Sequence, residues 1–252
     1  MNYDEAVKHT WAPAGGAHDG AGGGMKRERA LLPSSFVQVS IDTGWHEMSQ
    51  KHHWEHVYGS KASEELGWYE PRLETSLNLI QELGLAMDAS IIDVGGGAST
   101  LVDDLLDAGY RSITVLDISE KALSLSRQRL GSKAELVTWR VGDMEEIDLP
   151  EGHYDLWHDR AVFHFLTGVD QQRNYRDKLL SALAPYGHFV VGTFAPEAPP
   201  TCSGLPVQRY SPEQLEATLG ANLELLQHRK TLHITPGGVR QMYLYCHFRK
   251  TS

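Results

Sequence analysis

Short apolar runs alternate with helical patterns along residues 71–219, and this alternation constrains the fold more than any other feature of the sequence. The run Ser90–Val94 is bounded by glycines, which is typical of a strand buried on both faces. Similar patterns predict strands at 90–94, 112–117, 135–141, 154–158 and 188–194, and helices at 71–83, 101–106, 120–130 and 171–183. Strands that alternate with helices form a parallel α/β sheet.

Local signals fix several of the predicted helix ends. Pro71 suits the first turn of a helix, and Ser119 is a favourable N-cap for the helix over 120–130. Gly109 and Gly131 follow their helices as C-terminal caps. Ser211-Pro212-Glu213 opens one more helix, with serine as the N-cap.

The carboxyl-terminal part of the sequence predicts a different pairing. Two apolar stretches, 223–234 and 241–248, flank Pro236-Gly237-Gly238, which is a strong turn signal. The two stretches therefore predict a hairpin that gives the sheet an antiparallel end.

The first part of the chain shows no such regularity. Glycines and Pro13 interrupt residues 1–24, and the next residues carry a basic patch at Lys26, Arg27 and Arg29. We expect residues 1–47 to be a partly flexible extension and residues 48–252 to be one domain.

Composition excludes some classes of protein. The 252 residues carry 23 basic and 33 acidic side chains, a formal net charge of −10, which disfavours a dedicated nucleic-acid binder. No apolar run approaches the roughly 20 residues that cross a bilayer. The two cysteines, Cys202 and Cys246, cannot form a disulfide framework, and no signal-peptide pattern opens the chain, so we expect a cytoplasmic protein.

A glycine-rich turn follows the first of the alternating strands. Val94 ends that strand, Gly95-Gly96-Gly97 comes next, and a helix begins shortly afterwards. Glycines at this place let the backbone approach a ligand closely. The spacing lacks the third glycine that a dinucleotide-binding dehydrogenase prefers and the Gly-Lys-Ser/Thr of a phosphate-binding loop.

Acidic residues stand at successive strand ends. Asp117 closes the second strand, where an acid can accept hydrogen bonds from both hydroxyls of a ribose. Asp143 follows the third strand, in Gly142-Asp143-Met144, where it would meet an adenine amine. Open α/β sheets bind ligands at this edge, so with Asp93 the series indicates a nucleoside site.

The series D93-x-G95-x-G97, D117-I118-S119 and G142-D143-M144 resembles the class I S-adenosylmethionine-dependent methyltransferases, over about residues 49–250. The resemblance implies a doubly wound, mostly parallel seven-stranded sheet with an antiparallel terminal strand. It also implies S-adenosylmethionine as cofactor and no metal. The implied cofactor-binding residues are Asp93, Gly95, Gly96, Gly97, Asp117, Ile118, Gly142, Asp143 and Met144, with Trp54, Tyr58 and Tyr69 as aromatic residues of a lid.

The region after the fourth strand carries the candidate chemistry. It lacks the Asn/Asp-Pro-Pro-aromatic motif of nucleobase methyltransferases and is similar to the corresponding region of lysine methyltransferases that act on elongation factor and citrate synthase. His164 and His158 are candidate bases because imidazole titrates near neutrality. Asp159 could act as a base or hold the cofactor ammonium.

These observations predict an enzyme that transfers a methyl group from S-adenosylmethionine to a nitrogen, oxygen or sulfur atom of a small molecule. A protein lysine methyltransferase is the alternative enzyme, so a protein substrate stays open. A non-catalytic S-adenosylmethionine-binding protein is the alternative of another class. We expect no nucleic-acid partner and no membrane association.

Overall fold

The structure is a computed structural model that describes the backbone of residues 42–252 and side chains from Gln50 onward. The strands are β1 (Ser90–Val94), β2 (Ser112–Asp117), β3 (Val137–Val141), β4 (Tyr154–Arg160), β5 (Leu183–Phe194), β6 (Thr201–Cys202), β7 (Leu205–Pro206), β8 (Leu223–Ile234) and β9 (Arg240–Lys250). The helices are α1 (Asp42–Ser60), α2 (Glu74–Glu82), α3 (Leu101–Asp107), α4 (Glu120–Leu130), α5 (Val169–Ala182) and α6 (Pro212–Leu219).

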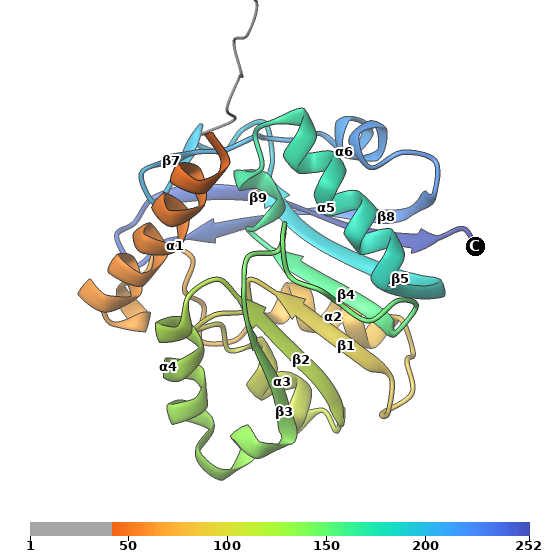
Figure 1. The fold of residues 1–252 in the computed structure, drawn as a ribbon, viewed down its shortest axis with the longest axis horizontal. Coiled ribbons are helices and arrows are strands. Elements are labelled where there is room, and N and C mark those ends of the chain that lie inside the picture. Colours follow the sequence, from red (N-terminus) through yellow and green to blue (C-terminus); the bar gives the residue numbers. More distant parts are fainter. Residues whose placement is uncertain (1–41) are drawn as a thin grey trace, which may run out of the picture. The chain divides into compact units, whose positions relative to one another are not determined.

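Seven of these strands form one sheet in the order β3-β2-β1-β4-β5-β9-β8 (Figure 1). The neighbours from β3 to β5 are parallel, whereas β9 runs antiparallel to both β5 and β8. The chain order reverses at β1, so the next strand in space on one side is β2 and on the other side β4. The carboxyl ends of β1, β2 and β4 therefore open onto one crevice, the usual ligand site of such sheets.

The sheet is covered on both faces, as the continuous apolar strands require. Ile91 points into one hydrophobic cluster together with side chains of α2, α3 and α4. Ile92 and Val94 point into a second cluster, which holds side chains of α5 and α6. Successive strand residues face opposite sides of a sheet, so both sets of helices bury apolar surface against β1. The predicted doubly wound α/β sheet is confirmed.

Most predicted elements are present, and the differences have local reasons. Pro71 does not begin a helix, because α2 starts only at Glu74 after the N-cap residue Leu73. The segment 131–136 forms 3₁₀ turns, so β3 starts at Val137 and not at residue 135. The small β6–β7 hairpin was not predicted, since its two-residue strands carry no periodic signal.

The capping signals agree closely with the structure. The Ser119 side chain accepts a hydrogen bond from the backbone N–H of Ala122 at 3.1 Å, and Gly131 follows α4 with φ of 56°. Ser211 caps α6 in the same way, with Pro212 as the first helical residue. These signals are local in the sequence, which is why they were predictable.

Two further expectations concern membrane-spanning helices and the amino-terminal extension. None of the helices found within residues 42–252 is long and apolar enough to cross a membrane. The expected extension 1–47 lies outside the residues whose side chains are described, and the boundary at residue 48 stays a prediction. The basic patch at 26–29 also lies outside the described residues.

Candidate functional site

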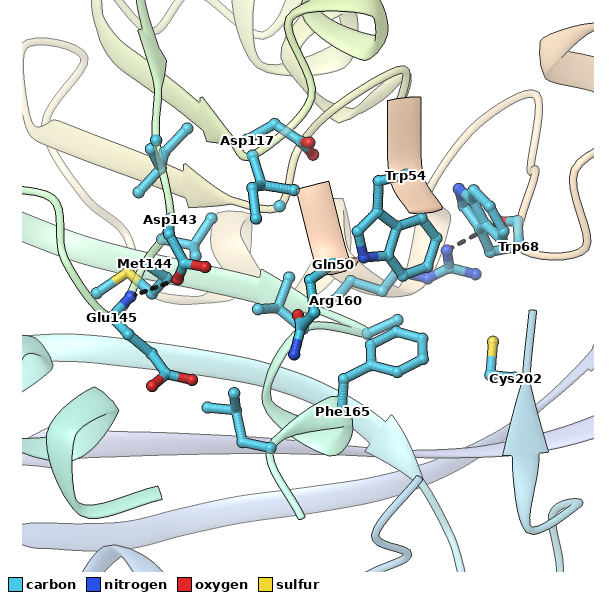
Figure 2. A pocket seen from close by; sticks show the side chains of 18 of the residues that line it. Gln50, Trp54, Trp68, Asp117, Asp143, Met144, Glu145, Arg160, Phe165 and Cys202 are labelled. Carbon is cyan, nitrogen blue, oxygen red and sulfur yellow. Dashed lines mark hydrogen bonds between the residues drawn. The ribbon is translucent and has the colours of Figure 1, made fainter. Parts of the chain in front are cut away.

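A cavity of about 880 Å³, its open mouth included, lies at the carboxyl ends of the parallel strands (Figure 2). Its lining comes from α1, from the loops after β1, β2, β3 and β4, and from β6. The lining residues are Gln50, Trp54, Tyr58, Trp68, Val94, Gly95, Leu116, Asp117, Ile118, Gly142, Asp143, Met144, Glu145, Arg160, Ala161, Val162, Phe165, Leu166 and Cys202.

The glycine turn after β1 is held against the end of β2. The backbone N–H groups of Gly95 and Gly96 both donate to the carbonyl oxygen of Leu116, at 2.7 and 3.2 Å. Gly95 and Gly97 have φ of 68° and 40°, in the region that favours glycine. A methyl group on Gly97 would lie 2.7 Å from Asp117 Oδ2. Glycine is therefore required here because the backbone of the turn packs closely against the end of β2.

Asp117 lines the cavity at the end of β2 and is 6 % exposed. Its Oδ1 accepts a hydrogen bond from the backbone N–H of Ser119 at 2.8 Å. Burial, followed by repulsion from the Asp93 and Glu55 carboxylates, raises the pKa of Asp117 to about 7. A carboxylate held in this way accepts hydrogen bonds strongly once it is ionised.

The loop after β3 completes the same end of the cavity. The N–H of Gly142 donates to the carbonyl oxygen of Asp117 at 3.0 Å, which places Asp143 beside the second strand end. Asp143 Oδ1 accepts from the backbone N–H of Glu145 at 2.8 Å, so the carboxylate is oriented by its own turn. Met144 lies next to it and contributes an apolar wall (Figure 2).

Asp93 lies beneath the glycine turn and does not line the main cavity. Its Oδ1 lies 2.7 Å from His158 Nδ1, and His158 Nε2 lies 2.9 Å from Ser76 Oγ. All three side chains are buried. These hydrogen bonds connect β1, β4 and α2. Asp93 and His158 also border a smaller neighbouring cavity, which Gly95, Gly96 and Arg160 line as well.

Asp159 supports the loop that follows β4. Its carboxylate accepts hydrogen bonds from the backbone N–H groups of Val162 and Phe163 and from the Tyr175 hydroxyl, the last at 2.5 Å. Burial raises the pKa of Asp159 to about 6. Ala161 in this loop has a φ of 71° and lines the cavity, so Asp159 stabilises a strained turn at the site.

His164 is completely buried and lies behind the cavity wall. Its ring packs edge-on against Phe165 and Phe194, with centroids 4.5 and 4.7 Å apart. Neither ring nitrogen has a hydrogen-bond partner among the described residues. Burial, and the nearby Arg160 cation, lower the pKa of His164 to about 3. The catalytic roles of His158, Asp159 and His164 stay predictions, because none of these residues lines the cavity.

Aromatic side chains close the other end of the cavity. Trp54 contacts Trp68 and Phe165 with ring centroids 5.7 and 5.2 Å apart, and Tyr58 contacts Trp68 at 5.8 Å. Tyr69 instead borders a separate small cavity. The structure thus brings together Trp54, Tyr58, Gly95, Asp117, Ile118, Gly142, Asp143 and Met144 of the predicted set, whereas Asp93, Gly96, Gly97 and Tyr69 lie outside the main cavity.

Sequence reasoning missed several side chains of the wall, among them Gln50, Glu145, Arg160 and Phe165. Arg160 ends the fourth strand and Phe165 follows it, in the region where the sequence analysis considered only His158, Asp159 and His164. Their position at the carboxyl end of a strand was a sequence signal that could have identified them as lining residues. Nothing in the sequence marked Gln50 or Glu145.

Comparisons with known proteins bear on this site. Residues 91–187 match the family model of a methyltransferase domain. Nodulation protein S of Rhizobium tropici is 29% identical over 115 residues, which cover 46% of this chain and 47% of that protein. The eEF1A lysine and N-terminal methyltransferase of Mus musculus is 23% identical over 137 residues, covering 54% of this chain and 19% of that protein. This chain thus spans between a fifth and a half of these relatives.

A solved structure shows the same fold. The 1,6-didemethyltoxoflavin-N1-methyltransferase of Burkholderia thailandensis, with bound 1,6-didemethyltoxoflavin and S-adenosylhomocysteine, aligns with a TM-score of 0.59 at 21% identity. The alignment covers 82% of this chain and 87% of that one.

The residues at the acidic end of the cavity fit S-adenosylmethionine. We propose that Asp117 accepts hydrogen bonds from the ribose hydroxyls and Asp143 from the adenine amine, because both carboxylates line this end of the cavity and Gly95 has no side chain there. Residues 91–187 thus match a methyltransferase domain, and the sheet has the fold of the class I S-adenosylmethionine-dependent methyltransferases.

Proposed function

We propose that this protein transfers a methyl group from S-adenosylmethionine to a nucleophilic atom of a small molecule and releases S-adenosylhomocysteine. One observation carries the proposal: a single cavity joins an acidic end at the carboxyl ends of β2 and β3 to an aromatic end formed by α1 and the loop after β4. The acidic end suits a nucleoside, and the aromatic end gives room for a second, less polar molecule.

Methyl transfer of this kind is an in-line displacement at a carbon bonded to a sulfonium, and the bound cofactor supplies that activated methyl group. The protein then has to align the acceptor and keep water out. Trp54, Trp68 and Phe165 do both, since the ring of Trp54 contacts the other two rings at the aromatic end. An acceptor that is already deprotonated needs no base, which is consistent with the absence of histidine among the lining residues from Gln50 onward.

The choice of a small molecule rests on the enclosure of the aromatic end. The ring of Trp54 on α1 and the segment around Trp68 lie over the loop after β4, so an acceptor must fit beneath them. The Burkholderia thailandensis enzyme, which shares the fold, is a methyltransferase crystallised with a small molecule. These observations support a small acceptor.

A protein lysine methyltransferase is the second candidate. The similarity to the mouse eEF1A lysine and N-terminal methyltransferase favours it. A lysine side chain would have to enter the cavity from its open mouth, with its ammonium at the aromatic end.

Calorimetric titration with S-adenosylhomocysteine, and with NAD as a control, tests the cofactor. We expect S-adenosylhomocysteine to bind and NAD not to bind. Binding of NAD alone would contradict the proposal.

A labelled-methyl assay tests the acceptor. The protein is incubated with methyl-labelled S-adenosylmethionine and a cell lysate separated into protein and metabolite fractions. Label in the metabolite fraction supports the proposal, and label in protein alone supports the lysine alternative. Cofactor binding with label in neither fraction would favour a non-catalytic binding protein.

A further inference from the structure

The two ends of the cavity differ in charge. Asp117, Asp143 and Glu145 belong to the loops after β2 and β3 and lie together in Figure 2, away from Arg160 and Cys202. The sheet order places β1 between β2 and β4, which separates these acids from Arg160 at the end of β4. Among the described lining residues, Arg160 is the only cation, and none of the acids lies on β4, β6 or α1.

Arg160 is fixed in place by partners from three other segments. Its Nε–H donates to the Tyr245 hydroxyl at 3.0 Å, and Nη1 donates to the carbonyl oxygen of Trp68 at 2.9 Å. Nη2 donates to the Glu70 carboxylate. A guanidinium has five N–H groups, so these bonds leave two donors unused. The side chain is therefore oriented before any ligand arrives and keeps donors to offer.

Glu70 is the acid that pairs with Arg160, and it also contacts a histidine. The same Glu70 oxygen lies 3.2 Å from His233 Nδ1, so the carboxylate is shared between the two side chains. Glu70 does not line the main cavity, whereas Arg160 does. The aromatic end of the cavity therefore faces the Arg160 cation and not the Glu70 carboxylate.

Two buried side chains near Arg160 have polar atoms without a hydrogen-bond partner among the described residues. The guanidinium carbon lies 4.7 Å from the centroid of the Tyr243 ring. The Tyr243 hydroxyl is buried and has no hydrogen-bond partner among the described residues, and neither ring nitrogen of neighbouring His164 has one. A buried polar group without a partner is costly, and ligands often supply the missing bond.

We propose that the methyl acceptor is an aromatic or conjugated small molecule that carries an oxyanion or carbonyl oxygen, and that Arg160 binds this oxygen at the aromatic end of the cavity. The rings of Trp54 and Phe165 supply the flat apolar walls, and Arg160 determines specificity. An alkylammonium group, such as that of a lysine side chain, meets a like charge there and no lining carboxylate. This inference rests on the proposed function and names its substrate class.

Two probes that share a phenol ring and carry opposite charges test the inference. Calorimetry measures the binding of 3-(4-hydroxyphenyl)propionate and of tyramine to the full chain saturated with S-adenosylhomocysteine. We expect the anion to bind at least about tenfold more tightly, the size of one charge-assisted hydrogen bond. Equal affinities, or tighter binding of tyramine, would overturn the inference.

Two substitutions should change this preference in opposite directions. Arg160→Gln should reduce it to within about threefold, because the charge-assisted bond is lost. Glu70→Gln should increase it, because the cation loses its balancing carboxylate. Arg140→Gln is the matched control, since Arg140 lies on β3, donates to the Asp148 carbonyl oxygen and does not line the cavity. If Arg160→Gln fails to fold, Glu70→Gln still decides, and an unchanged preference in it contradicts the inference.

A third pair of ligands separates an acceptor role from a cofactor role. S-adenosylhomocysteine carries an amino-acid tail, and 5′-methylthioadenosine lacks it. We expect Arg160→Gln to leave the affinity ratio of these two ligands unchanged. If the variant weakens S-adenosylhomocysteine alone, Arg160 serves the cofactor carboxylate and the inference is wrong. If neither ligand binds to the wild-type protein, the proposed function fails instead.

Discussion

At the scale of single residues, the buried carboxylate of Asp117 lowers the free energy of unfolding when it is ionised. Its carboxylate is 6 % exposed and lines the cavity floor, and its pKa is raised to about 7 from an ordinary value of 3.8. Between these two pH values the folded protein holds a proton that the unfolded chain has released. The contribution of Asp117 to the free energy of unfolding is therefore greatest at low pH and is lost as the pH rises through about 7.

Ligand binding should depend on pH in the opposite sense. The ionised carboxylate is the better acceptor for ribose hydroxyls, so S-adenosylhomocysteine should bind more weakly as the pH falls below about 7, by up to about tenfold per pH unit. Calorimetry between pH 5.5 and 8.5, values that bracket that pKa, measures this dependence. An affinity that does not change over this range would contradict the assignment of Asp117.

Asp117→Asn provides the matched control. It keeps the shape of the side chain and removes its titration, so binding should be weaker than wild type at high pH and nearly independent of pH. Its free energy of unfolding at pH 8, measured with urea, should exceed that of wild type by about 1–3 kcal/mol, because no buried charge remains.

The sequence placed the acidic residues and could not place their partners. Asp93, Asp117 and Asp143 follow apolar runs directly, and their position at strand ends is a local property. His158 pairs with Asp93 across 65 positions of sequence and with Ser76 across 82. Which way a side chain points depends on the neighbouring strand and helix, and the candidate bases His158, on β4, and His164, after β4, are both buried.

At the scale of elements, the β1–α3 turn is the tightest junction at the site. Gly95 has a φ of 68°, and a methyl group on it would overlap the side chain of Val162 in the loop after β4. Gly84, after α2, has a similar φ of 64° but has open space around it. The two glycines therefore separate the cost of backbone strain from the cost of a steric clash.

We expect Gly84→Ala to cost about 1 kcal/mol, which is the strain of an alanine in this backbone region. Gly95→Ala should cost about 2–4 kcal/mol, because Val162 or the turn must also move. The displacement of Val162 changes the cavity wall, so Gly95→Ala should also weaken S-adenosylhomocysteine binding, whereas Gly84→Ala should not. Urea denaturation and calorimetry measure the two effects, and equal costs for both substitutions would refute the packing argument.

The elements themselves were predictable wherever the sequence carries a local signal. The strand Ser90–Val94 and the helix Glu120–Leu130 have the predicted bounds, since an apolar run and a serine cap define them. The helix expected at Pro71 begins later, because the N-cap is Leu73 and not a residue that precedes the proline. Its true start depends on packing, since Leu73 and Leu77 are buried in the core.

At the scale of the whole molecule, the boundary of the domain depends on where the packed core of the described residues begins. The three hydrophobic clusters are built from residues 54–248. The chain divides into a unit of residues 1–40 and a unit of residues 41–252, and α1 begins at Asp42. We propose that the second unit is the methyltransferase domain, although the sequence suggested a start at residue 48.

Two truncations distinguish these boundaries. Removing residues 1–40 should leave the thermal midpoint and the affinity for S-adenosylhomocysteine close to those of the full chain. Removing residues 1–47 shortens α1 on the side of Gln50 and Trp54, two residues that line the cavity, and should weaken binding through loss of helix. Calorimetry and thermal unfolding of both variants measure this, and equal behaviour would favour the later boundary.

The sequence by itself determined the α/β class, the antiparallel end of the sheet, the glycine turn and the acids at the strand ends. Each of these depends on periodicity, caps and turns, which act over a few residues. Only the tertiary structure decided which side chains share a cavity. Arg160 reaches its partners Trp68 and Tyr245 across 92 and 85 positions of sequence, and His158 and His164 are buried outside the lining of the main cavity. Side-chain direction at a strand end is set by packing between distant elements, which no local pattern records.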